Sequence, residues 1–355
     1  MRILILNRRD IRNPSAGGAE VYTHEIARGL TAKYGCEVSV YASEFPDGSQ
    51  EETLDGVRYL RRGGEATVHL RGFCYALRNK AHFDCIVDEF NGIGFFTFFF
   101  RNSVLLIHQL YREFWFRELG VAGAFPYVIE PMFLKRYRKK RTITVSNSTK
   151  HDLERLGFHD VRVVMNALRN SPFPVTVGKE DRLTMVFLGR LRSTKRPEEA
   201  IRIFKRVKEK VPSVQLWMIG KGPAEEELRA MAKDEDGVVF KGWVSEGEKM
   251  NLLKRAHVLL VPSVREGFGI NVIESAAVGT PAIGYDVPGL RDSIRQGETG
   301  YLVHSAGEAA RAVEALLADP ARYDEIAERC ICYAREFDWG SRVDEFWAAI
   351  CGPPA

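Results

Sequence analysis

Short apolar runs alternate with helical patterns along almost the whole chain. In the first half, strand-like runs occupy residues 2–7, 36–42, 84–90, 103–109, 142–146 and 161–166. In the second half, they occupy residues 183–190, 214–222, 237–243, 257–263, 280–286 and 300–303. Buried runs of this length, separated by amphipathic segments, indicate parallel strands connected by helices. The pattern therefore predicts an α/β protein with doubly wound, Rossmann-like parallel sheets.

A stretch without periodicity, residues 169–182, interrupts the alternation and predicts a linker. We therefore place one domain at residues 1–170 and a second at residues 171–336. The last helical stretch, about 337–355, is expected to pack back onto the first domain. A chain of 355 residues exceeds the size at which a single core usually keeps growing, which favours this division. Ligands of such sheets bind beyond the carboxyl ends of the strands, so we expect a cleft between two facing domains.

Composition narrows the class of protein further. Hydrophobic residues make up 45% and charged residues 28%, which are ordinary values for a globular chain. The start of the chain becomes charged too early for a signal peptide or a membrane span, so the sequence predicts a cytoplasmic protein. The net charge of +4 is modest and no recognition motif accompanies it. Binding of nucleic acid is therefore a weak alternative.

The stretch REGFGINVIESAAVGTPAIG contains the first candidate chemistry. Glu266 and Glu274 stand eight positions apart, one in a loop that follows an apolar strand and one in the helix after it. Carboxylates accept hydrogen bonds from ligand hydroxyls, and the free N–H groups of Gly269, Ile270 and Asn271 at the helix start can hold an anion. Hydroxyls, phosphate and hydroxyls in that order describe a nucleotide sugar. The spacing alone is equally typical of a surface glutamate followed by one that the helix dipole favours.

Cations that could bind a diphosphate lie in another loop. Arg190 and Lys195 follow an apolar strand and precede Pro197, which is a typical first residue of a helix. An arginine can grip two phosphate oxygens, whereas a lysine adds a mobile point charge. The alternative is a solvated basic loop, because Arg192 and Arg196 lie there too.

The first half offers three further candidates. Gly17 and Gly18 stand at the entrance of a predicted helix, where missing side chains permit close approach of a phosphate or sugar. His108 ends an apolar strand, at the sheet edge where ligands bind. A single histidine is often structural, so its position is the argument for a functional role.

Together these motifs resemble the retaining glycosyltransferases of GT-B fold, specifically the family 4 group with an E-x7-E motif. The resemblance extends over nearly the whole chain. It is carried by residues 17–20, 108, 144–153, 189–201 and 262–284. It implies that the first domain binds the acceptor and the second binds the nucleotide-sugar donor.

The resemblance also implies roles for individual residues. Glu266 would hold hydroxyls of the donor sugar, Glu274 the ribose, and Arg190 with Lys195 the diphosphate. The implied donor-binding set is Gly17, Gly18, Arg190, Lys195, Glu266, Gly267, Phe268, Gly269, Ile270, Asn271 and Glu274. The implied catalytic set is His108, Glu266, Arg190 and Lys195. Asn271 stands where such proteins often have proline, which leaves the donor sugar open.

The implied reaction moves a hexose from a UDP-, GDP- or ADP-sugar to a glycan or lipid-linked acceptor. It implies no metal and no other cofactor, because Arg190, Lys195 and the helix N–H groups would stabilise the departing diphosphate. The acceptor would attack from the face that the diphosphate leaves. Two alternatives remain: a GT-B sugar-nucleotide epimerase, which needs acid and base carboxylates that we cannot place, and a non-catalytic nucleotide-sugar-binding protein.

A basic and aromatic segment of the first half predicts an acceptor or membrane patch. Its members are Trp115, Lys135, Arg136, Arg138, Lys139, Lys140 and Arg141. A lysine- and arginine-rich segment with nearby aromatic side chains can lie in the headgroup region of an anionic membrane. Runs of charge are also common on ordinary solvated surfaces. A peripheral position at the inner face of the membrane is therefore a hypothesis alongside the cytoplasmic location.

Overall fold

The computed structural model describes residues 1–169 and 178–352, so the predicted linker at 169–182 lies largely outside the described residues. The chain divides into two compact units. The first unit comprises Met1–Trp115, Val121–Ala167 and Asp338–Ala355. The second comprises Phe116–Gly120 and Leu168–Phe337. Each unit contains its own sheet, which confirms the predicted fold class of two parallel-sheet α/β domains.

The first unit is built on an eight-stranded sheet with the order β3-β4-β2-β1-β5-β6-β7-β8. Its strands are β1 (Arg2–Leu6), β2 (Glu37–Ala42), β3 (Glu51–Leu54), β4 (Val57–Arg61), β5 (Cys85–Glu89), β6 (Ser103–Ile107), β7 (Thr142–Thr144) and β8 (Val161–Val163). Neighbouring strands pair in parallel, except that β3 and β4 form an antiparallel hairpin. The sequence reasoning missed this hairpin.

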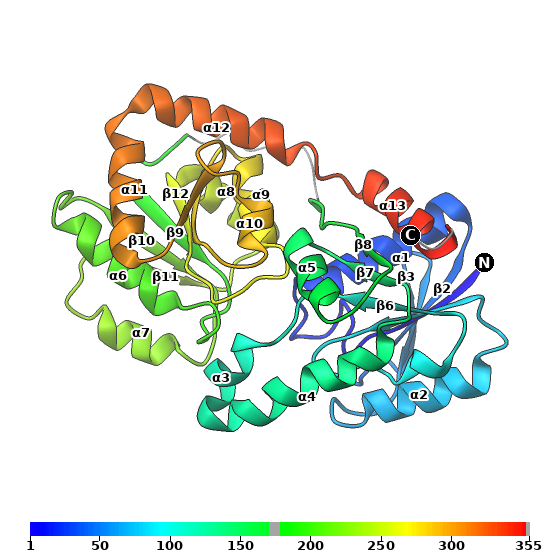
Figure 1. Cartoon of the computed structure of the whole chain (residues 1–355). Helices are drawn as coiled ribbons and strands as arrows, with labels where there is room; N and C mark the ends of the chain where they lie inside the picture. The colour runs from blue at the N-terminus through cyan, green and yellow to red at the C-terminus, as the bar shows by residue number, and fades with distance from the viewer. Residues whose placement is uncertain (170–177, 353–355) are drawn as a thin grey trace. The chain divides into compact units, whose positions relative to one another are not determined.

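Helices surround the first sheet (Figure 1). They are α1 (Gly18–Tyr34), α2 (Val68–Asn79), α4 (Ala124–Leu134), α5 (Asn147–Arg155) and α13 (Trp339–Cys351), with short 3-10 turns at Thr97–Phe99, Gly120–Gly123 and Lys135–Tyr137. Helix α3 (Glu113–Leu119) spans the division between the units. The C-terminal α13 packs on α1, where Tyr34 and Trp347 stack with ring centroids 4.4 Å apart and Lys33 pairs with Asp344.

The second unit has a six-stranded sheet with the order β11-β10-β9-β12-β13-β14, and each strand pairs in parallel with its neighbours. Its strands are β9 (Thr184–Leu188), β10 (Gln215–Ile219), β11 (Val238–Gly242), β12 (Val258–Val261), β13 (Ala282–Tyr285) and β14 (Gly300–Val303). Its helices are α6 (Pro197–Lys208), α7 (Glu225–Met231), α8 (Glu246–Arg255), α9 (Ile270–Ala277), α10 (Leu290–Ser293), α11 (Ala306–Ala318) and α12 (Pro320–Ala334).

The core explains why the central strands have uninterrupted apolar runs. Both β5 and β6 are buried along their whole length, and so is β12, because helices cover both faces of a parallel sheet. Strand order then decides where ligands bind. In the first sheet, β2 to β4 lie on one side of β1, and the later strands β5 to β8 lie on the other side. In the second sheet, β10 and β11 lie on one side of β9, and β12 to β14 lie on the other. Loops leaving such a switch point diverge and open a crevice at the carboxyl edge.

Candidate active site

The loops after β9 and β12 meet at the switch point of the second sheet. The backbone N–H of Val264 donates to the carbonyl of Thr194 at 3.0 Å, which joins the two loops. The N–H of Glu266 donates to the carbonyl of Pro288 at 3.0 Å. Gly289 has φ +85°, and a Cβ there would lie 2.2 Å from the Glu266 carbonyl oxygen. Only glycine permits this close approach, so the turn after β13 supports the backbone of Glu266.

Lys195 and Glu266 form an ion pair across these loops. Lys195 Nζ lies 2.6 Å from both carboxylate oxygens of Glu266, and Ser263 Oγ donates to Oε1 at 2.6 Å. The Glu266 side chain is 10% exposed and that of Lys195 is 29% exposed. The carboxylate is therefore nearly buried, while the ammonium group keeps access to solvent. The two residues that were predicted to hold sugar and diphosphate thus lie in direct contact.

Glu274 lies in α9, just past its first turn, and pairs with a lysine from another helix. Lys249 Nζ of α8 lies 2.8 Å from Glu274 Oε1 and 2.8 Å from Glu246. Burial raises the pKa of Glu274, and the attraction of Lys249 only partly opposes this. Burial acts to lower the pKa of Lys249, but its two carboxylate neighbours outweigh burial and the pKa is raised. The contacts therefore favour the charged form of Lys249, whereas burial disfavours the charged form of Glu274.

The entrance of α9 combines a glycine in the left-handed region with two fixed side chains. Gly269 has φ +89°, and a Cβ there would lie 2.8 Å from Ser293 Oγ. Asn271 Nδ2 donates to the carbonyl of Leu188 at the end of β9, at 3.1 Å. The Phe268 ring is 2% exposed and packs against Phe337. Phe268 was predicted to bind the donor, but its ring belongs to the core, so only its backbone is available at the site.

Arg190 lies on the exposed part of the loop after β9. The loop is held by its neighbour, because the N–H of Leu191 donates to the carbonyl of Lys221 at 3.0 Å. Gly220 has φ +129°, and a Cβ there would lie 2.0 Å from the Gly189 carbonyl oxygen. The loops after β9 and β10 therefore pack backbone against backbone. This contact holds the base of the loop that carries Arg190.

His108 lies at the carboxyl edge of the first sheet and is held by a carboxylate. Its Nε2 lies 3.1 Å from Glu89 Oε1, and Thr23 donates to the other oxygen of Glu89 at 2.6 Å. The edge of the Tyr22 ring contacts the imidazole, with centroids 5.1 Å apart. Glu89 is fully buried at the end of β5. These contacts fix the orientation of the ring and leave Nδ1 as the nitrogen that can face a ligand.

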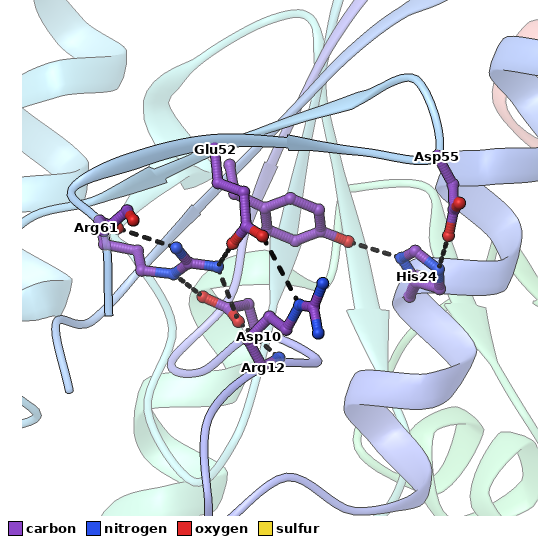
Figure 2. Close-up of polar contacts among 8 residues, drawn as sticks. Asp10, Arg12, His24, Glu52, Asp55 and Arg61 are labelled. Carbon is purple, nitrogen blue, oxygen red and sulfur yellow. Dashed lines mark hydrogen bonds and ion pairs between the residues drawn. The ribbon is translucent and has the colours of Figure 1, made fainter. Parts of the chain in front are cut away.

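The loop that leads to Gly17 and Gly18 is anchored by a buried ion pair (Figure 2). Arg61, at the end of β4, donates to Asp10 at 2.6 Å, and both side chains are almost completely buried. Arg61 also donates to Glu52 at 2.9 Å. Figure 2 shows this network beside the contact of His24 with Asp55, which ties α1 to the hairpin. The missed hairpin therefore positions the predicted phosphate turn.

The carboxylate of Glu20 already lies at the start of α1. The N–H of Gly17 donates to Glu20 Oε2 at 2.7 Å, and Arg9 Nε lies 3.4 Å from the other oxygen of Glu20. Glu20 is thus the group that satisfies the helix entrance in this structure. A phosphate that approached Gly17 and Gly18 would compete with this carboxylate.

The predicted patch divides into two parts. Lys135, Arg136, Arg138 and Lys139 are exposed and, together with Met132, line a surface hollow of about 520 Å³. The other three members are engaged elsewhere. The Trp115 indole donates to Glu130 at 3.1 Å, Lys140 donates to the carbonyl of Phe100, and Arg141 pairs with Asp160 and with carbonyls of α13. We therefore remove these three residues from the patch.

Three functional candidates escaped the sequence reasoning: Ser263, Lys249 and Glu89. Ser263 ends the predicted strand 257–263, so its position at the carboxyl edge was a usable signal. Glu89 is the penultimate residue of the predicted strand 84–90, one position after Asp88. Lys249 gave no signal, because nothing in the spacing of α8 shows which carboxylate it faces.

Two family models match the chain. "Glycosyltransferase Family 4" matches residues 16–169 and "Glycosyl transferases group 1" matches residues 172–337. Together they cover both units, and the solved structures described next have the GT-B fold. The chain therefore belongs to the family 4 type of GT-B glycosyltransferases, as the sequence motifs predicted.

The solved structures agree over the full length. The sucrose-phosphate synthase of Thermosynechococcus elongatus is 20% identical with a TM-score of 0.80, covering 98% of this chain and 97% of that one. HepE of Anabaena, solved in complex with UDP and glucose, is 16% identical with a TM-score of 0.76, covering 99% and 100%. At these identities the similarity shows the fold.

Curated relatives match over shorter stretches. The trehalose synthase of Pyrococcus horikoshii is 38% identical over 133 residues, which is 34% of this chain and 32% of the relative. The D-inositol 3-phosphate glycosyltransferase of Acidothermus cellulolyticus is 32% identical over 179 residues, which is 46% and 40%. The match thus spans less than half the length of these relatives. Among the described residues, no helix combines the length and apolar character that crossing a bilayer requires.

Proposed function

We propose that this chain transfers a hexose from a nucleotide-diphosphate sugar to a hydroxyl of a glycan or lipid-linked acceptor, with retention at the anomeric carbon. The observation that carries the proposal is the cluster of Lys195, Glu266 and Ser263 at the switch point of the second sheet. Two relatives are named as a trehalose synthase and a D-inositol 3-phosphate glycosyltransferase. HepE was solved with UDP and glucose and with UDP-glucose. The HepE complexes favour a UDP-sugar as the donor.

The ion pair of Lys195 and Glu266 supports a partner exchange on donor binding. In the structure each charge satisfies the other, which avoids leaving either one unpaired in a sheltered position. An incoming diphosphate attracts Lys195, and Glu266 then accepts hydrogen bonds from the sugar hydroxyls. Ser263 keeps one oxygen of Glu266 in place during the exchange. Arg190 adds a second cation from the same loop as Lys195.

The chemistry follows from where negative charge develops. The bond between the anomeric carbon and the phosphate oxygen breaks, and its electron pair goes to the diphosphate. Once the donor is bound, Arg190, Lys195 and the N–H groups at the start of α9 stabilise this charge without further rearrangement. The acceptor oxygen bonds to the anomeric carbon on the face that the diphosphate leaves, and its proton passes to the departing phosphate oxygen. In this scheme the protein's own cations replace a metal ion.

His108 contributes by orientation in this proposal. Its Nε2 is engaged by Glu89, so the ring presents Nδ1 to the donor sugar. A histidine held in this way is suited to hydrogen bond a sugar hydroxyl as the glycosidic bond polarises. Because Glu89 is fully buried, it acts through His108 as a positioning residue.

The proposal is tested with a thermal-shift panel of UDP-, GDP- and ADP-sugars, followed by measurement of nucleoside diphosphate release. We expect a UDP-sugar to raise the melting temperature, and release to be accelerated by a suitable glycan or lipid-linked sugar. Release that persists in chelator supports a reaction without metal, whereas loss of release that magnesium restores contradicts it. No shift with any nucleotide sugar would contradict the proposed donor class.

A further inference from the structure

Helix α4 presents an apolar face to solvent. Phe125, Val128, Ile129 and Met132 have the i, i+3, i+4, i+7 spacing of a single helix face, and they are 74%, 58%, 41% and 60% exposed. A surface helix of a globular protein normally turns such a face towards the core. In α4 the apolar face points outwards, so it needs an explanation.

Contacts on the other side of α4 hold this orientation. Glu130 is buried and accepts hydrogen bonds from the backbone N–H of Tyr111 at 2.8 Å, the N–H of Arg112 at 3.0 Å and the Trp115 indole. Phe133 packs against Phe90, Phe96, Phe98 and Tyr137. Rolling the helix to bury its apolar face would break these contacts. The outward face is therefore part of the folded structure.

The apolar face leads directly into the basic hollow. Met132 belongs to both, and the other lining residues are Lys135, Arg136, Arg138 and Lys139. Between residues 124 and 140 the single acidic residue is Glu130, and it is buried. The positive charge of the hollow is thus not offset by a surface carboxylate from the same segment. Figure 1 shows α4 running along the outside of the first unit.

We propose that the α4 face and the basic hollow bind the surface of an anionic membrane. The apolar side chains enter the boundary between headgroups and acyl chains, and the hollow holds the phosphate of an anionic lipid. Apolar burial and attraction of lysine and arginine to anionic lipid are the two sources of affinity of interfacial helices. The surface shares no residue with the proposed donor site, so this inference can fail or stand independently of the transferase proposal.

The test is sedimentation of the full chain with vesicles of phosphatidylcholine alone or mixed with phosphatidylglycerol. We expect binding to the mixed vesicles that falls with salt. Met132→Glu should weaken it about tenfold, because it places a charge where an exposed apolar side chain is proposed to enter the membrane. Lys135→Glu with Arg136→Glu should weaken it about 30-fold or more, at about 1 kcal/mol for each cation lost.

Matched controls lie in the second unit. Trp243→Glu removes an exposed apolar side chain, and Arg206→Glu with Lys233→Glu reverses two exposed cations. These controls should bind the mixed vesicles like the unmodified chain, and all variants should keep the thermal shift with nucleotide sugar.

Absence of binding to anionic vesicles, or equal loss in the controls, would overturn the proposal. The proposal would also be overturned if the chain does not bind vesicles and light scattering shows a dimer that Met132→Glu dissociates. In that case the α4 face covers a second copy of the chain.

Discussion

Glu266 and Glu274 each pair with a lysine, but the two regions differ in what holds the pair. Glu266 and Lys195 come from two loops at a switch point, and Lys195 is 29% exposed. Glu274 and Lys249 come from two helices, and Lys249 is 15% exposed and shared with Glu246. A pair between loops can exchange partners with a ligand at lower cost than a pair between packed helices. We infer that the first region carries the chemistry and the second holds the nucleotide.

The largest expected effect concerns the cations. Lys195→Ala and Arg190→Ala should each lower the rate of nucleoside diphosphate release by about 10²-fold or more, because they remove stabilisation of charge that develops in the transition state. The matched control is Arg192→Ala in the same loop, which should stay close to the unmodified rate. Unchanged turnover in both Lys195→Ala and Arg190→Ala would contradict the assignment.

Glu274→Ala should act mainly on binding. Loss of hydrogen bonds to a charged group costs about 1.5–3 kcal/mol, so nucleotide affinity should fall by about tenfold or more while turnover at saturation changes less. Calorimetric titration with UDP and kinetics at saturating donor separate the two quantities. Glu246→Ala, which also removes a partner of Lys249 but is exposed, is the control. If Glu274→Ala lowers turnover but not the affinity for UDP, Glu274 acts in the reaction and does not hold the nucleotide.

Single and double variants measure how much the Lys195–Glu266 ion pair contributes to the free energy of unfolding. Lys195→Met leaves a nearly buried carboxylate without its cation, and we expect a loss of about 1–2 kcal/mol, reduced from the value for a fully buried pair because Lys195 is partly exposed. Adding Glu266→Gln should recover most of the stability and none of the turnover. Denaturant unfolding measures the first quantity and nucleoside diphosphate release the second. If Lys195→Met alone and Lys195→Met with Glu266→Gln unfold at the same free energy, the pair is not formed in solution.

The pH dependence of nucleotide binding sharpens the comparison. Burial raises the pKa of Glu274, so its carboxylate becomes protonated at a higher pH than an ordinary glutamate does. If the ionised form binds the ribose, affinity should fall as the pH is lowered through that raised pKa. Lys249→Gln removes an opposing attraction, so the loss should begin at a still higher pH. Glu274→Gln should remove this dependence; if it persists, another group is responsible.

The smallest expected effect comes from the first unit. Glu89→Gln keeps a hydrogen bond to His108 but removes the charge, and we expect a reduction in turnover of severalfold with little change in nucleotide affinity. If Glu89 acts through the histidine, the double variant with His108→Asn should have the same turnover as His108→Asn alone. Additive losses in the double variant would give Glu89 a separate role.

The alternation of apolar runs and helices was sufficient to predict both sheets and the loops that carry Lys195 and Glu266, because burial on both faces leaves a clear pattern. The hairpin of β3 and β4 was missed, although Asp55 and Gly56 between alternating residues are a typical hairpin turn, and both have positive φ. The ion pairs could not be predicted. Lys249 meets Glu274 through the packing of α8 on α9, and helical spacing does not specify which side chains face each other across two helices.

Phe268 shows that a sequence motif does not distinguish a ligand contact from a core contact. The motif places it among donor-binding residues, yet its ring packs on Phe337 in the core. A motif records that a position is constrained, and only the packing shows whether the constraint comes from the ligand or from the core.

The most direct test of the account is a crystal structure with a nucleotide-diphosphate sugar bound. We predict that Lys195 Nζ lies within hydrogen-bond distance of a phosphate oxygen and that Glu266 accepts hydrogen bonds from the sugar. A nucleotide sugar bound elsewhere, with Lys195 still 2.6 Å from both carboxylate oxygens of Glu266, would contradict the partner exchange on which the proposed function rests.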